Sequence, residues 1–149
     1  MNARHPDPLA VFIGGLEGLV DGGADEATIF RDGRTLLAAL IARDDWLPAA
    51  LAEPDPAGYR IHLLHRDPAG RFSVSAMVWG PGQGTPIHDH TVWGMVGVLR
   101  GRERCEEFRL PARPGEPLVA GHVHELEPGD IDLVSPTVGD IHQIGRAHV

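Results

Sequence analysis

The chain has 149 residues, of which 42% are hydrophobic and 23% charged, and this is the length and composition of one globular domain rather than of a disordered segment. Thirteen basic residues against 21 acidic ones give a formal net charge of −8, which argues against nucleic acid or an anionic membrane as the main partner. All the basic residues are arginines, so chemistry that requires a lysine, such as a Schiff base, is excluded.

The cysteine content and the N-terminal sequence indicate in which cellular compartment the protein is expected. Cys105 is the single cysteine, so an intrachain disulfide is impossible and an oxidising compartment is not required. A metal site built from thiolates alone would need more cysteines. The first residues lack the basic-then-apolar pattern of a signal peptide, and no apolar run is long enough to span a membrane. We therefore expect a cytoplasmic protein.

The N-terminal third is predicted to be helical. Over residues 9–52, apolar side chains recur near helical spacing, most regularly between 24 and 51. Gly33 and Pro48 are expected to divide the second helical stretch. The pattern favours a helical layer that covers a core.

From Tyr59 onward the hydrophobic period changes to two, which is typical of strands. Glycine and proline turns separate the segments, and Pro111 to Glu116 forms a polar loop. The expected strands are 72–79, 87–99, 105–110, 119–126 and 131–134. Short strands at this spacing predict a mainly β fold, an antiparallel barrel or sandwich of the jelly-roll type over residues 59–143, in a single domain.

Histidine is the unusual residue here, with nine in the chain. His88 and His90 flank Asp89, and on a strand residues two apart share a face, so both imidazoles could reach one metal ion. Such a pair is a weak signal by itself. It stands in a frame of glycines that includes Gly82 and Gly101, and a third histidine, His142, follows Gly139.

This frame resembles the two motifs of the cupin superfamily, except that Gly94 stands where the first motif has a glutamate. A closer resemblance is to bacterial members of the cysteine dioxygenase family. The segments that carry it are Trp79 to Gly84, Pro86 to His90, Gly97 to Gly101 and Gly139 to His142. The resemblance implies a cupin-type antiparallel β-barrel in which His88, His90 and His142 hold Fe(2+).

The resemblance also implies an activity, the oxidation of cysteine or a related small thiol such as 3-mercaptopropionate by O2 to the sulfinate. The family commonly binds the substrate carboxylate through an arginine, and Arg60 lies in the matching region, although the register there can shift. Neutral imidazoles also suit zinc, copper or nickel. Two alternatives therefore stay open: a zinc site that activates water, and a non-catalytic cupin that binds a metal or small ligand.

The remaining candidates have structural interpretations. We expect His122 and His124 on an exposed strand, His62 and His65 as polar strand or loop groups, His5 and His148 as inert terminal residues, Cys105 as a small core residue, and Trp79 and Trp93 as core or rim aromatics. Asp140 is expected to be a turn residue or a partner of a ligand histidine.

The C-terminus differs from the family pattern. Family members continue well past the third metal histidine and place there a serine, a histidine and a tyrosine near the substrate, so the catalytic residues stay unknown in this chain. Residues 144–149 resemble a translated sequencing adapter. We expect a truncated gene product with a non-native tail and doubtful activity.

Overall fold

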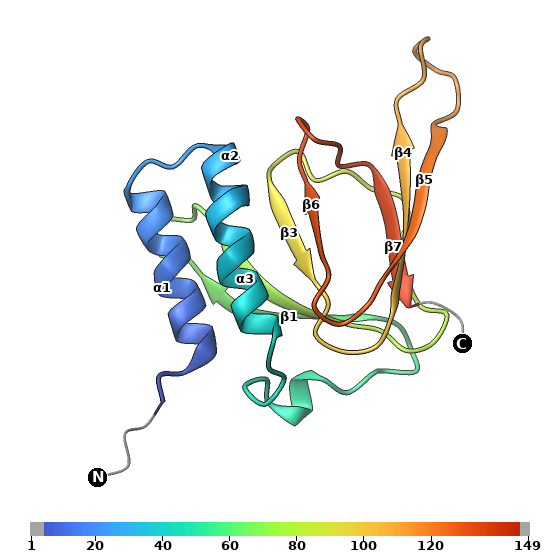
Figure 1. The fold of residues 1–149 in the computed structure, drawn as a ribbon. Coiled ribbons are helices and arrows are strands. Elements are labelled where there is room, and N and C mark those ends of the chain that lie inside the picture. The colour runs from blue at the N-terminus through green and yellow to red at the C-terminus, as the bar shows by residue number, and fades with distance from the viewer. Residues whose placement is uncertain (1–4, 147–149) are drawn as a thin grey trace.

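The computed structural model describes residues 5–146, which form helices at the N-terminal end followed by strands (Figure 1). The helical elements are α1 (Pro8–Asp21), α2 (Glu26–Thr28), the π-helix η1 (Ile29–Gly33), α3 (Arg34–Ile41) and the 3-10 helix η2 (Ala49–Leu51). The strands are β1 (Arg60–Arg66), β2 (Ser73–Val78), β3 (Gly94–Gly97), β4 (Glu103–Arg109), β5 (Val119–Leu126), β6 (Ile131–Val134) and β7 (His142–Arg146).

The helical layer is confirmed, with one boundary misplaced. Asp7 and Asp25 cap the two helical stretches by accepting hydrogen bonds from first-turn backbone N–H groups. The second stretch runs without a break from Glu26 to Ile41, so Gly33 does not interrupt it. A Cβ on Gly33 would lie 2.9 Å from Cε of Met95, which shows that this glycine lets the helix approach β3 closely. The helix ends at Ile41, well short of residue 51.

The strands pair antiparallel throughout and form three sheets, β1-β2, β3-β6 and β5-β4-β7. Within residues 5–146 these ladders do not close into a barrel. The fold is therefore mainly antiparallel β with an N-terminal helical layer. In Figure 1 the β3-β6 sheet lies between the helices and the β5-β4-β7 sheet.

The strand predicted over residues 87–99 is shorter than expected, because only β3 is regular. Pro86 offers no backbone N–H, and Thr91 has a φ of 58°, in the left-handed region that ends an extended run. His88 makes a single bridge, to His142. The two histidines of the motif thus lie on a loop rather than on a regular strand.

Two apolar clusters hold these parts together. The larger one packs α1 and α3 against Phe72 and the β3-β6 sheet, with Phe12, Leu16 and Leu40 among its most buried members. The smaller cluster consists of Trp79, Val98, Leu126 and Ile144, with Val96 against it. Trp79 is buried here and Trp93 packs on the larger cluster, so both tryptophans belong to the core, as expected.

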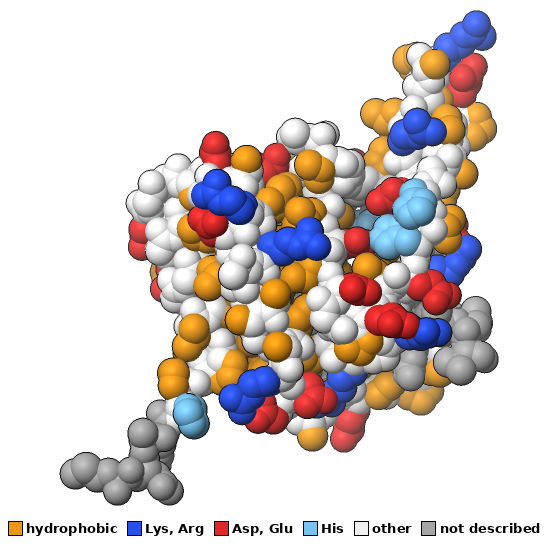
Figure 2. Space-filling model, in the orientation of Figure 1, with side chains coloured by type: hydrophobic (Ala, Val, Ile, Leu, Met, Phe, Trp, Pro, Cys, Tyr) orange, Lys and Arg blue, Asp and Glu red, His pale blue; other side chains and the backbone are white. Residues whose placement is uncertain are grey.

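The hairpin of β4 and β5 projects from the rest of the molecule, and its surface mixes apolar and charged side chains (Figure 2). Leu110, Leu118 and Val119 are exposed on it. Positive and negative side chains alternate over the face drawn in Figure 2 rather than forming a basic patch. None of the helices among residues 5–146 is long and apolar enough to cross a membrane.

Only the first part of the predicted non-native tail, residues 144–149, is described by the structure. Residues 144–146 are part of β7, and Ile144 is buried in the smaller apolar cluster. Residues 147–149, with His148, lie outside the described part, while His5 is inside it and exposed.

Candidate metal centre

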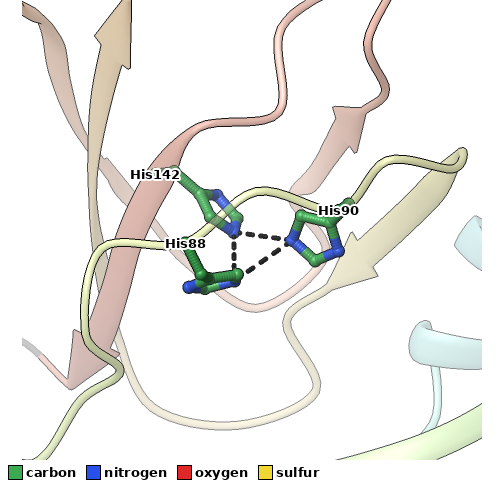
Figure 3. Close-up of side chains that lie close together, drawn as sticks. All are labelled: His88, His90 and His142. Atoms are coloured by element: carbon green, nitrogen blue, oxygen red, sulfur yellow. Dashed lines mark hydrogen bonds between the residues drawn. The ribbon is translucent and has the colours of Figure 1, made fainter. Parts of the chain in front are cut away.

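The structure brings the side chains of His88, His90 and His142 together, although about fifty residues separate His142 from the other two. Their Nε2 atoms form a small triangle, with edges of 3.2 Å between His88 and His90, 2.9 Å between His90 and His142, and 3.1 Å between His142 and His88 (Figure 3). His142 is buried, and the other two are half-buried. All three rings point at one common centre.

Backbone contacts fix this convergence. His88 and His142 exchange a pair of backbone hydrogen bonds, with N···O distances of 3.0 and 2.9 Å. The loop that carries His90 is held by Asp140, whose Oδ2 accepts from the backbone N–H of His90 at 3.2 Å and of Thr91 at 3.0 Å. Asp140 is thus a partner of a ligand histidine, as one of the two expectations had it, but it acts through the backbone of His90 and not through the ring.

The second nitrogen of two of the rings has its own partner. His88 Nδ1 lies 2.9 Å from the carbonyl oxygen of Pro86, which can only accept, so Nδ1 carries the proton. His142 Nδ1 lies 3.6 Å from Sγ of Cys105. With protons on Nδ1, the lone pairs of Nε2 face one another at about 3 Å, and a cation at the centre is the partner that satisfies them all.

Burial favours the neutral form of His90 and His142, which is the form that binds a metal. Desolvation, assisted by the neighbouring His88 and His90 rings, lowers the pKa of His142 to about 4. Desolvation and His88 also lower the pKa of His90. At neutral pH His90 and His142 are therefore available as neutral ligands rather than imidazolium ions.

The size of the triangle bears on the coordination geometry. With metal–nitrogen bonds of about 2.1 Å, two nitrogens are about 3.0 Å apart on an octahedral face and about 3.4 Å apart in a tetrahedron. The observed edges of 2.9–3.2 Å match the octahedral face more closely. Three ligands on one face leave the opposite positions free for exogenous ligands.

A cavity of about 890 Å³ adjoins the three rings, and apolar side chains such as Trp93 and Val96 form much of its wall. Glu103 also borders it, with Oε2 buried and without a hydrogen-bond partner among the described residues. Burial, followed by repulsion from Asp132, raises the pKa of Glu103 to about 7. A protonatable carboxyl thus shares the cavity with the histidines, and nothing in the sequence pattern had indicated it.

Arg60, the predicted carboxylate-binding residue, lies at the start of β1 with its side chain exposed. Its guanidinium forms an ion pair with Asp55, and it is not among the residues that border the cavity. Its assignment stays a prediction.

The other histidines and the cysteine follow the expectations only in part. His62 and His65 lie on β1, His122 is exposed, and Cys105 is buried, as expected. His124 is half-buried instead of exposed, because Nε2 lies 2.7 Å from Oδ2 of Asp132. Cys105, His124 and Asp132 form a second group of possible metal ligands that the sequence pattern did not reveal.

No protein-family model matches the sequence. The relation to the cysteine dioxygenase family therefore stays a prediction that depends on the motifs. What the geometry establishes is a cluster of three imidazoles, free of carboxylate ligands, beside a large and mostly apolar cavity.

Proposed function

We propose that this protein is an iron-dependent thiol dioxygenase, which oxidises cysteine or a related small thiol such as 3-mercaptopropionate with O2. One observation carries the proposal: three imidazole Nε2 atoms converge in a triangle of 2.9–3.2 Å beside a cavity of about 890 Å³. The motifs around His88 and His142 support the same assignment.

The finer description of the fold belongs to this proposal. We propose that the sheets are parts of a cupin-type jelly roll. In support, all strand pairs are antiparallel, and residues 84–88 lie along β7 through the bridges Gly84–Gly145 and His88–His142. These bridges add a further extended segment at the edge of the β5-β4-β7 sheet, beside β7.

The donor set fits a ferrous ion and an anionic substrate. Three neutral ligands leave the charge of a divalent cation uncompensated, so an anionic thiolate is favoured as a further ligand. Iron, when bound, supplies the activation of O2. In the overall reaction, RSH and O2 give RSO2⁻ and H⁺, and both oxygen atoms are transferred to sulfur.

The chain's own residues have separate roles in this scheme. The three histidines hold the metal and leave one side open toward the cavity. Asp140 keeps the His90 loop in place, and the apolar wall around Trp93 excludes water from the reacting groups. Arg60 is proposed to bind the substrate carboxylate, after its ion pair with Asp55 opens.

The test is performed on the chain loaded anaerobically with ferrous iron. Oxygen uptake and sulfinate formation are measured with cysteine and with 3-mercaptopropionate, and thiol binding to the metal is followed separately by the electron paramagnetic resonance of the ferrous–nitrosyl adduct. We expect one O2 consumed per sulfinate formed, and a spectrum that changes when thiol is added. His142→Ala, which keeps two of the three ligands, is the matched control and should show neither effect.

The outcomes separate the alternatives. A nitrosyl spectrum that no thiol perturbs, together with no oxygen uptake, would overturn the proposal. Hydrolytic activity that appears only with zinc would favour water activation. Small-molecule binding at the metal without oxygen uptake or hydrolysis would favour a non-catalytic cupin.

A further inference from the structure

A second group of metal-ligand side chains lies on the other side of His142. It consists of Cys105 on β4, His124 on β5 and Asp132 on β6, and one donor atom of each lies within 4.8 Å of the other two. None of these residues belongs to the three-histidine centre. Sulfur, imidazole nitrogen and carboxylate oxygen are the three protein donors that zinc uses.

Strand register explains why these side chains meet. Cys105 and His124 are directly opposite in the antiparallel β4-β5 pair, which places their side chains on the same face. That face is turned toward β6, from which Asp132 reaches His124 at 2.7 Å. Cys105 Sγ is fully buried in the protein interior, next to His142 Nδ1 at 3.6 Å.

Hydrogen bonding within this group is uneven. His124 Nδ1 is buried and has no hydrogen-bond partner among residues 5–146. His124 Nε2 and Asp132 Oδ2 are closely paired at 2.7 Å, whereas the buried thiol of Cys105 has only a weak contact, 3.6 Å from His142 Nδ1. The sulfur is therefore the donor atom that gains most from a cation. A cavity of about 410 Å³ borders Cys105 and Asp132, so a water molecule or another small ligand has room to complete a fourth position.

We propose that Cys105, His124 and Asp132 bind a divalent cation of the zinc type, at a site distinct from the three histidines. The thiol proton leaves as the sulfur–metal bond forms, and the bond between His124 and Asp132 lengthens to admit the ion. In this site the cation joins β4 and β5 to β6. No backbone ladder links the β5-β4-β7 sheet to the β3-β6 sheet in the described residues, so the ion ties together two sheets that otherwise share only side-chain and loop contacts.

Cobalt distinguishes the two sites, because only a thiolate ligand gives an intense sulfur-to-cobalt charge-transfer band in the near ultraviolet. The double variant His88→Ala/His90→Ala removes the first site and leaves the second intact. We expect the wild-type chain to bind two equivalents of Co²⁺ with this band, and the double variant to bind one equivalent with the band unchanged. Cys105→Ser should bind one equivalent without the band.

X-ray absorption of the zinc-loaded double variant gives an independent reading. One sulfur neighbour at about 2.3 Å from zinc supports the site. A coordination shell of nitrogen and oxygen only, or a folded double variant that binds no cation, overturns it. Asp132→Asn, which keeps the side-chain size, serves as a second ligand variant if Cys105→Ser does not fold, and we expect it to weaken binding at least tenfold. Because the double variant lacks the three-histidine centre, failure here leaves the dioxygenase proposal untouched.

Discussion

His88 and His142 are bonded twice through their backbones, and the Nε2 atoms of the same two residues lie 3.1 Å apart. Main-chain hydrogen bonds thus align two positions that are 54 residues apart in the sequence, and this alignment brings their side chains together. The positions of these two rings follow from this backbone bridge, which attaches the His88 loop to β7.

Removing His142 should strongly weaken metal binding at the three-histidine centre. His142→Ala deletes one of three ligands and the bond to Cys105, so we expect the affinity for Fe²⁺ to fall by more than about 100-fold, the upper range for residues that only support a ligand. Competition with a metal-sensitive chelator measures this change. His62→Ala, on β1 and outside the cluster, is the matched control and should bind as the wild type does.

Asp140 should control affinity without touching the metal. Asp140→Ala removes the acceptor for the backbone N–H groups of His90 and Thr91, and Thr91 holds a left-handed φ that then has less support. We expect a loss of about 10–100-fold in metal affinity, with little change in the cooperativity of unfolding.

Asp89→Ala changes an exposed carboxylate in the same loop and is the control for charge. Equal losses from Asp89→Ala and Asp140→Ala would show that net charge near the site, rather than loop positioning, determines affinity.

Gly145 should tolerate no side chain. A Cβ there would lie 2.4 Å from the carbonyl oxygen of Gln83 and 2.7 Å from Cα of Gly84, so Gly145→Ala forces β7 away from the segment that leads to His88. We expect a loss of about 1–3 kcal/mol in the free energy of unfolding, together with weaker metal binding.

Gly14→Ala is the contrasting substitution, because Gly14 lies in α1 with no atom within 4 Å of the new Cβ. It should stabilise the protein by about 0.5–1 kcal/mol. Urea unfolding of both variants measures the difference, and a stable Gly145→Ala protein would contradict the close backbone approach.

Asp67 should govern acid stability. Its buried carboxylate accepts three hydrogen bonds from Arg71, and this partner holds the pKa of Asp67 well below its usual range. Because the pKa is lower in the folded than in the unfolded chain, the stabilisation is present above about pH 4 and is lost as the pH falls further.

We therefore expect Asp67→Asn to lower the urea midpoint near neutral pH and to flatten its decline in acid. Denaturation curves at about pH 7 and about pH 3 test this. If the urea midpoint of the variant falls as steeply in acid as that of the wild type, other carboxylates and not Asp67 cause the loss of stability.

Glu103 should give a pH dependence of the opposite sign. Burial raises its pKa to about 7, so the folded state binds a proton that the unfolded state has already released. The stability of the folded state that depends on this proton is fully present below about pH 4.5 and is lost as the pH rises through about 7. Glu103→Gln, which mimics the neutral form, should be more stable than the wild type at about pH 8 and similar to it near pH 4.5. Urea unfolding at both pH values measures this, and a difference in stability between the two proteins that does not change with pH would contradict the prediction.

Patterns along the chain predicted much of the fold. The strands predicted over residues 119–126 and 131–134 have the same bounds as β5 and β6. The spacing of His88, His90 and His142 identified a cluster that the structure brings together. These features are local, or depend on a motif with a fixed frame of glycines.

Other features depend on contacts that no local pattern records. Residues 87–99 alternate like a long strand, but the backbone at Thr91 ends it. Cys105 and His124 meet through strand register and Asp132 arrives from another sheet, so their grouping follows only from tertiary structure. Gly33 resembles a helix breaker and is instead a contact surface for Met95.

Residues 140–142 contact all three rings of the centre or their backbones: they supply one imidazole, pair with the main chain of His88, and anchor the His90 loop through Asp140. Until this short segment leaves the ribosome, the earlier histidines have nothing to align them. A nascent chain stalled before Asp140 would therefore have two of the three imidazoles and no preformed three-histidine centre.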